Sequence, residues 1–129
     1  MERVTTGEAE TLHSIINMDS TCGLYSIHVI DMVAHDLLKY NQLYGNLNPK
    51  FVVKTFTSEE MSATMQMFYE SGLNHRVSMT QYLTLYNAKQ CNATLVTNDM
   101  AYAEIAQEMG ISTLSTNNLK KRRSAWNRK

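Results

Sequence analysis

The chain has 129 residues, enough for one domain that buries about two-thirds of its unfolded surface. Apolar residues make up 43% and charged residues 19%, which is ordinary globular usage and excludes a disordered or fibrous chain. No apolar run approaches the roughly 20 residues of a membrane span, and the N-terminus lacks the basic and apolar segments of a signal peptide, so we expect a cytoplasmic protein.

The net charge of zero conceals an uneven distribution along the chain. The last ten residues, KKRRSAWNRK, hold six of the twelve Lys and Arg residues and no acid, so positions 1–119 carry six bases and twelve acids. We therefore expect one domain over 1–119 and a basic tail over 120–129. Such a tail can neutralise phosphates and stack on a base, and it can equally be a solvated end or fold back on the acidic body. The candidate nucleic-acid-binding residues in it are Lys120, Lys121, Arg122, Arg123 and Trp126.

The first half of the chain alternates helical and strand patterns. Apolar side chains recur at helical spacing over 8–17, and LYSIHV at 24–29 has the composition of a short buried strand. A second helical pattern covers 30–45 and ends on a glycine, which suits a helix C-cap. KFVVKTF at 50–56 predicts a further strand. These residues therefore predict a helix, a strand, a helix and a strand in that order.

The second half continues the alternation. Helices are expected over 58–72 and, from a cap at its first serine, over 78–92. The strand ATLVT at 93–97 comes next, then a helix over 100–110 and a last strand, ISTLST, over 111–116. Short apolar strands that alternate with helices are typical of a parallel sheet covered on both faces. The predicted fold class is α/β, a three-layer α/β/α sandwich with a central parallel sheet.

An acid stands where the strand at 93–97 gives way to a helix. Ligands of parallel α/β folds gather at the carboxyl ends of strands, so Asp99 is a candidate functional residue. The alternative is a structural role, in which Asn98 or Asp99 caps the helix by accepting a backbone N–H bond worth about 1 kcal/mol. The position of the acid leaves both interpretations open.

Three stretches resemble the PIN-domain family, metal-dependent nucleases that include the toxins of VapBC-type toxin–antitoxin modules. LVTNDMAYAEIAQEMGI at 95–111 resembles the C-terminal signature of that family. VSMTQYLTLYNAKQCNATLVTND resembles its Ser-x-x-Asp helix, and YSIHVIDMVAHDLLKY resembles its second strand and the helix that follows. The eighteen-residue step from Gln81 to Asp99 matches the usual spacing between the family's third and fourth acids. The register of the resemblance is continuous over residues 24–116.

This resemblance implies a site of three or four carboxylates that hold Mg²⁺ or Mn²⁺ and orient a water for RNA cleavage. The second acid falls on Asp36 and the fourth on Asp99, which are the implied metal ligands. The third position holds Gln81, whose carbonyl can bind a cation weakly but brings no charge. The residues that the resemblance implies for positioning water or phosphate are Ser78, Thr97 and Asn98.

The first acid of the family pattern is missing. Its strand normally ends in Asp-Thr or Asp-Ser, and Thr5-Thr6-Gly7 takes that place here after a very short strand. Either the first strand has degenerated, or the reading frame begins downstream of a lost segment. A second assignment makes YSIHVID the first strand, with Asp31 as the first acid and Glu60 as the second.

Because two of the four acidic positions are replaced, we consider several functions. The first is a PIN-like domain, catalytically weak or inactive, that binds RNA or a protein partner. The alternative is a Mg²⁺- or Mn²⁺-dependent endoribonuclease of the toxin–antitoxin type, with Asp36, Asp99 and Gln81 in the catalytic site. A third is an interaction protein without a nucleic-acid partner. The resemblance further implies a homodimer and an antitoxin-like protein partner.

Overall fold

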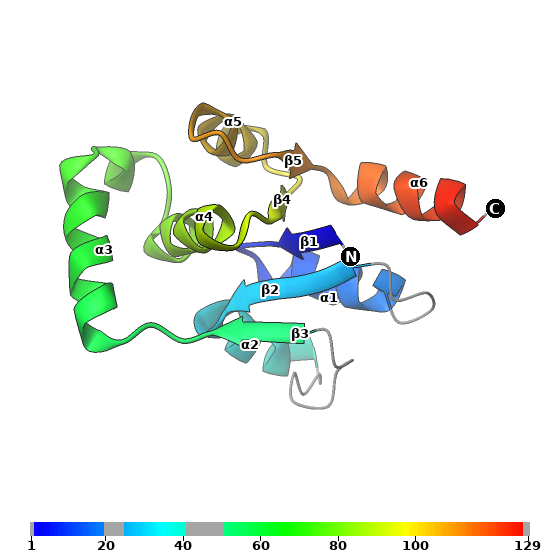
Figure 1. Ribbon diagram of the computed structural model, residues 1–129, viewed down its shortest axis with the longest axis horizontal. Helices are drawn as coiled ribbons and strands as arrows, with labels where there is room; N and C mark the ends of the chain where they lie inside the picture. The colour runs from blue at the N-terminus through cyan, green and yellow to red at the C-terminus, as the bar shows by residue number, and fades with distance from the viewer. Residues whose placement is uncertain (1, 20–24, 41–50, 128–129) are drawn as a thin grey trace.

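A five-stranded parallel sheet forms the middle of the protein (Figure 1). The computed structural model describes residues 2–19, 25–40 and 51–127, and its strands lie in the order β3-β2-β1-β4-β5. All neighbouring strands run in the same direction, so their carboxyl ends meet at one edge of the sheet. The strands are β1 (Glu2–Thr5), β2 (Tyr25–Ile30), β3 (Phe51–Lys54), β4 (Thr94–Val96) and β5 (Thr113–Leu114).

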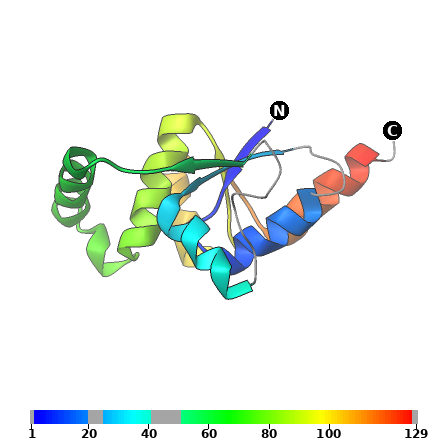
Figure 2. The same ribbon diagram turned by 90° about the horizontal axis from the view of Figure 1, so that it is seen from below.

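Helices cover both faces of the sheet. The α-helices are α1 (Ala9–Asp19), α2 (Asp31–Asp36), α3 (Ser58–Glu70), α4 (Met79–Cys91), α5 (Met100–Glu108) and α6 (Thr116–Asn127), with 3-10 helices η1 (Leu37–Tyr40) and η3 (Leu73–His75). Figure 2 shows α1, α2 and α6 together below the strands. Leu95 of β4 packs with residues of α4 and α5, whereas its neighbour Val96 packs with residues of α1 and α6. Successive strand residues point to opposite faces, so the predicted three-layer α/β/α sandwich is confirmed.

The short first strand is present, and it lies at the centre of the sheet between β2 and β4. Its last two residues, Val4 and Thr5, are fully buried. Thr5 pairs in register with Leu95, which brings the ends of β1 and β4 side by side. The stretch YSIHVI is β2, so the assignment that made it the first strand is wrong.

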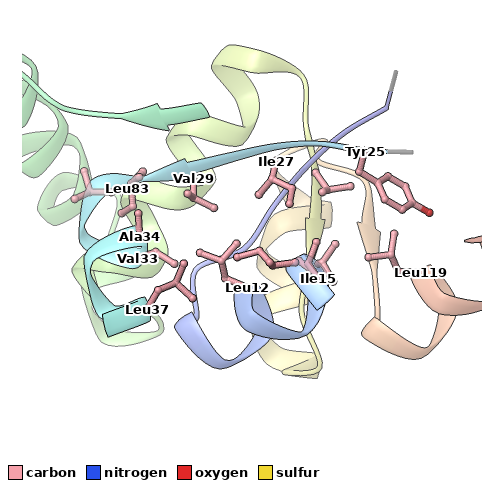
Figure 3. Packing of buried hydrophobic residues seen from close by; sticks show 14 residues of the cluster. Leu12, Ile15, Tyr25, Ile27, Val29, Val33, Ala34, Leu37, Leu83 and Leu119 are labelled. Carbon is pink, nitrogen blue, oxygen red and sulfur yellow. The ribbon is translucent and has the colours of Figure 1, made fainter. Parts of the chain in front are cut away.

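The larger hydrophobic core lies between the sheet and the layer of α1, α2 and α6 (Figure 3). Leu12 and Ile15 of α1 are fully buried there beside Ile27 of β2 and Leu119 of α6. Burial of one such side chain contributes about 1.5–3 kcal/mol. The cluster therefore holds α1 and the first turns of α6 against the sheet.

Two helices begin with the same reciprocal cap. In α3, Thr57 Oγ1 accepts a hydrogen bond from Glu60 N at 3.1 Å, and Glu60 Oε1 accepts one from Thr57 N at 3.0 Å. In α4, Ser78 and Gln81 form the equivalent pair at 3.1 and 2.9 Å. Each such capping box satisfies N–H groups that would otherwise lack partners. The helix start expected at Ser78 is confirmed.

Two segments differ from the sequence-based expectation. The helix expected over 30–45 is α-helical only in α2 and then tightens into η1, and residues 41–50 lie outside the described residues. The basic residues 120–127 form part of α6, because the helix starts at Thr116 and Leu119 anchors its first turn in the core. Among the helices that the structure describes, none combines the length and apolar character needed to cross a membrane.

Candidate functional site at the carboxyl edge of the sheet

Four segments meet where β1 and β4 end. The residues after β1, Thr6–Glu8, lie beside the residues after β4, Thr97–Asp99, because the two strands are paired in register. The first turns of α4 and α5 reach the same edge, since the Tyr102 hydroxyl of α5 donates a hydrogen bond to the Gln81 carbonyl of α4 at 2.9 Å. This edge brings together Gln81, Thr97, Asn98 and Asp99.

Asp99 is the N-cap of α5. Its Oδ1 accepts a hydrogen bond from Tyr102 N at 3.2 Å, and its own N–H donates to Thr97 Oγ1 at 3.1 Å. Asp99 is also exposed at the edge of the sheet. The structural role is therefore established, and it leaves the carboxylate within reach of a ligand.

Gln81, at the position of the third acid, is engaged in the capping box of α4. Its Oε1 accepts the Ser78 N–H at 2.9 Å, while Ser78 Oγ accepts the Gln81 N–H at 3.1 Å. The carboxamide oxygen is thus directed at the start of its own helix, and it carries no negative charge. Both residues have a structural role here, and a role for Ser78 in positioning water or phosphate stays a prediction.

Glu8 is a carboxylate at this edge that the sequence pattern did not identify. Its Oε1 accepts a hydrogen bond from Thr97 Oγ1 at 3.3 Å, and its Oε2 accepts one from Thr11 Oγ1 at 3.4 Å. Because Thr97 Oγ1 also accepts the Asp99 N–H, one threonine links the two acidic residues. Its place in the sequence could have identified this residue, since Glu8 is the first acid after the short strand that ends at Thr5.

Tyr102 fills the space between these segments. It is almost completely buried, and burial raises the pKa of its phenol far above the ordinary value of 10.0. The phenol therefore stays protonated and donates its hydrogen bond to the Gln81 carbonyl. The backbone of Gly7 passes so close that a Cβ there would lie 2.9 Å from Tyr102 Oη and 3.4 Å from Thr84 Oγ1. A side chain at this position would force the Tyr102 ring or the backbone to shift.

Asn98 joins the edge to α6 and does not cap α5. Its Nδ2 donates a hydrogen bond to Thr116 Oγ1 at 3.0 Å, and its Oδ1 accepts one from Thr116 N at 3.1 Å. Thr116 is the first residue of α6. Of the two caps that the sequence allowed for α5, Asp99 is the one found, and Asn98 instead serves the start of α6.

The predicted nucleic-acid-binding residues lie on α6. Lys120, Lys121 and Arg122 are exposed on this helix. Arg123 and Trp126 are further along α6, and their side chains lie outside the described part of the structure. The fold therefore presents three of these basic side chains on one helix that is anchored to the core.

Asp36 is the last residue of α2 and is half-buried. The helix starts directly after β2 at Asp31, so Asp36 lies five residues on, about 7.5 Å further along the helix axis. Among the residues that the structure describes, no three His, Cys, Asp or Glu side chains form a group that could hold a metal ion. Glu8 and Asp99 are suitable ligand types for Mg²⁺, but this donor set does not fit the acid-rich site that the resemblance implies. Metal binding by Asp36 and Asp99 stays a prediction.

Comparison with known proteins identifies the fold. Neither a protein-family model nor a curated protein matches the sequence. Among solved structures, a PilT N-terminus domain protein from the hyperthermophilic archaeon Sulfolobus solfataricus P2 is similar with a TM-score of 0.63 and 16% identity, over 95% of this chain and 93% of that one. A domain of a functionally unknown protein from Methanocaldococcus jannaschii DSM 2661 gives 0.54 and 14%, over 89% and 91%.

VapBC2 from Rickettsia felis, solved with a DNA fragment from its promoter, is similar with a TM-score of 0.52 and 14% identity, over 88% of this chain and 98% of that one. Identities of 14–16% establish the fold alone. This protein has the fold of a PilT N-terminus, or PIN, domain, and the resemblance found in the sequence is confirmed at that level.

Proposed function

We propose that this protein is a PIN-fold domain that binds RNA and has little or no nuclease activity. The observation that carries the proposal is the capping box of α4, in which the neutral Gln81 side chain accepts the Ser78 N–H at 2.9 Å. Cleavage of the kind implied by the resemblance needs clustered carboxylates that hold a divalent cation and orient water. Gln81 at the third position and the threonines at the end of β1 bring no negative charge to such a cluster.

The exposed basic side chains of α6 support RNA as the ligand. Lys120, Lys121 and Arg122 are exposed on one helix, whereas residues 1–119 carry twice as many acids as bases. Contacts between basic side chains and phosphates supply most of the affinity of non-specific RNA binding. We therefore expect the RNA strand to dock on the exposed basic side chains of α6.

Fluorescence anisotropy with a labelled single-stranded RNA tests this proposal. The native protein is compared with the double variant Lys120→Gln/Lys121→Gln, and the control is Lys39→Gln/Arg76→Gln, which removes two exposed charges outside α6. We expect the α6 variant to bind more weakly and to lower the slope of log affinity against log salt by about 0.7 for each lost phosphate contact. Equal affinities in the two variants would contradict RNA docking on α6.

A metal-dependent endoribonuclease of the toxin–antitoxin type is the second candidate, and Glu8 is the observation that favours it. The Thr97 hydroxyl donates a hydrogen bond to Glu8 and accepts one from the N–H of Asp99, the residue at the fourth acidic position. The edge therefore keeps a second carboxylate near the place of the missing first acid. This candidate predicts RNA cleavage that requires Mg²⁺ or Mn²⁺ and is lost in both Glu8→Gln and Asp99→Asn.

The likeness to VapBC2 also supports a wider proposal about partners. We propose that the protein is a cytoplasmic homodimer and that an antitoxin-like protein binds it. Light scattering of the purified protein tests the first part, with twice the mass of the 129-residue chain expected. A mass equal to that of a single chain at all concentrations would contradict the homodimer.

A further inference from the structure

A cleft of about 550 Å³ opens at the opposite edge of the sheet from the candidate site. It lies between the amino ends of β1 and β4 and the carboxyl ends of α4 and α5, and its polar lining includes Glu2, Arg3, Lys89, Asn92, Thr94 and Ser112. Pockets of about 300–1,000 Å³ accommodate small molecules the size of a nucleotide. The cleft is therefore large enough for a phosphate group with part of its sugar and base.

The charges at the cleft favour an anion. Arg3 and Lys89 are both exposed, and Glu2 is the one acid in the lining. The Glu2 carboxylate is paired with Arg122 of α6, with 2.7 Å between Oε2 and Nη2. Because that partner offsets the acid, Arg3 and Lys89 are the charged groups of the lining that can attract a phosphate.

Arg3 is held in a fixed position at the cleft. One of its Nη atoms donates a hydrogen bond to the carbonyl of Cys91 at 2.8 Å. A guanidinium has five N–H donors in a rigid fork, so most of them stay free for another acceptor. An arginine that is oriented in advance loses less conformational freedom when it binds a phosphate oxygen.

The cleft adjoins the basic helix through the Arg122–Glu2 pair. Lys120 and Lys121 are exposed on the same helix as Arg122, so a single strand that follows α6 arrives at the rim of the cleft. We propose that this cleft binds a phosphate group of an RNA strand that lies along α6. This inference rests on the proposed RNA binding, and a free mononucleotide is the other source of the same phosphate chemistry.

The simpler explanation of the two basic residues is that they stabilise the carboxyl end of α4, where cations interact favourably with the helix dipole. Arg3 bonds to the carbonyl of the last residue of α4, and Lys89 lies in its last turn. Such a role changes the stability of the fold and leaves RNA affinity unaffected. Ligand binding and urea unfolding therefore have to be measured on the same variants.

Two measurements test the proposal. In the first, anisotropy with labelled single-stranded RNA compares Lys89→Gln with Lys39→Gln, an exposed lysine that does not line the cleft. We expect Lys89→Gln to weaken binding about threefold to tenfold and to lower the salt slope by about 0.7, as loss of one phosphate contact does. In the second, AMP or inorganic phosphate is added to ¹⁵N-labelled protein, and the amide signals of Asn92, Thr94 and Ser112 are expected to shift.

The outcomes separate this proposal from the one on which it rests. If RNA affinity falls in the α6 double variant but Lys89→Gln equals its control and AMP causes no shifts, the cleft proposal is overturned and RNA binding by α6 stands. If the native protein binds no RNA, the proposed function fails. In that case, AMP-induced shifts of the amide signals that disappear in Lys89→Gln support the phosphate site with a free nucleotide as its source. A spectrum that AMP leaves unchanged overturns the cleft proposal.

Discussion

Thr97 and Glu8 lie 89 positions apart in the chain, and their side chains are joined by a 3.3 Å hydrogen bond at the carboxyl edge of the sheet. The same Thr97 hydroxyl accepts the Asp99 N–H. The edge that would hold a catalytic cluster in a PIN-domain nuclease is therefore occupied by helix caps and threonine hydrogen bonds. Glu8 and Asp99 place carboxylates beside Thr97 at this edge, and both also have structural roles.

Substitutions of Asp99 can distinguish its role as a helix cap from the effect of its negative charge. Asn and Asp are equally good N-caps, whereas Ala at this position costs about 1 kcal/mol. We therefore expect Asp99→Asn to keep the native free energy of unfolding and Asp99→Ala to lower it by about that amount. Urea unfolding followed by circular dichroism measures both values. Equal destabilisation by the two substitutions would show that the charge and not the cap matters for folding.

The close approach of Gly7 to Tyr102 predicts a specific coupling between them. A Cβ at Gly7 would lie 2.9 Å from Tyr102 Oη, so we expect Gly7→Ala to cost about 1–3 kcal/mol through overpacking. Tyr102→Phe removes the hydrogen bond from the phenol to the Gln81 carbonyl, at a cost of about 0.5–1.5 kcal/mol. The double variant removes the clashing oxygen, so its cost is expected to be smaller than the sum.

Urea unfolding of the native protein, the two single variants and the double variant forms the cycle that measures this coupling. Contacting residues usually show interaction energies of roughly 0.5–3 kcal/mol. Strict additivity of the two single changes would mean that the Gly7 backbone is not constrained by the phenol.

The layers of the fold could be predicted from the sequence because the strands are short apolar runs between long helical patterns. Ser78 marked the start of α4, since a serine three residues before Gln81 is a strong capping signal. Asp99 was found because a strand end and a helix start coincide there. Each of these features depends on residues that are close together in the sequence, so a local sequence pattern is enough to predict it.

The rest of the site depends on contacts between distant parts of the chain. Glu8 belongs to a loop, and only the fold brings it to Thr97. The basic segment was interpreted as a tail because Leu119, the buried residue that anchors the start of α6, lies just before a run of charges. Asn98 and Asp99 were both candidates for the cap of α5, because Thr116, the partner of Asn98 at the start of α6, is eighteen positions away and lies outside a local pattern.

The link between Asn98 and Thr116 predicts how firmly α6 is held. Asn98→Ala removes the side-chain hydrogen bonds to Thr116, the first residue of α6, each worth about 1 kcal/mol. We expect the amides of α6 to exchange with solvent several-fold faster, as measured by hydrogen exchange. The control is Asn117→Ala, an exposed position on the same helix. Unchanged protection in Asn98→Ala would mean that other contacts, such as the burial of Leu119 and the Arg122–Glu2 pair, hold the helix without it.

The capping box of α3 predicts a dependence of stability on pH. The hydrogen bond from the Thr57 N–H, helped by that from Lys54, holds the pKa of Glu60 below its ordinary value of 4.5. A carboxyl whose pKa is lower in the folded state stabilises the protein above pH 4.5, and this contribution is lost as the pH falls through the folded-state pKa. We therefore expect the free energy of unfolding to decrease with acid below pH 4.5.

Urea unfolding between pH 7 and pH 3 measures this dependence in the native protein and in Glu60→Gln. The variant is expected to lack the part of the acid-induced loss that Glu60 causes. Glu59→Gln is the matched control, because Glu59 is the neighbouring acid in the same first turn and lies outside the capping box. Identical pH profiles for Glu60→Gln and the native protein would contradict the assigned pKa direction.

The central claim is that the protein binds RNA without cleaving it efficiently. The most direct measurement incubates one end-labelled single-stranded RNA with the native protein and with Asp99→Asn, in Mg²⁺, in Mn²⁺ and in EDTA, and follows complex formation and strand length together. We expect a retarded complex whose RNA stays intact under all three conditions. Fragments that form with the native protein only in the presence of a divalent cation, and that are absent with Asp99→Asn, would contradict it.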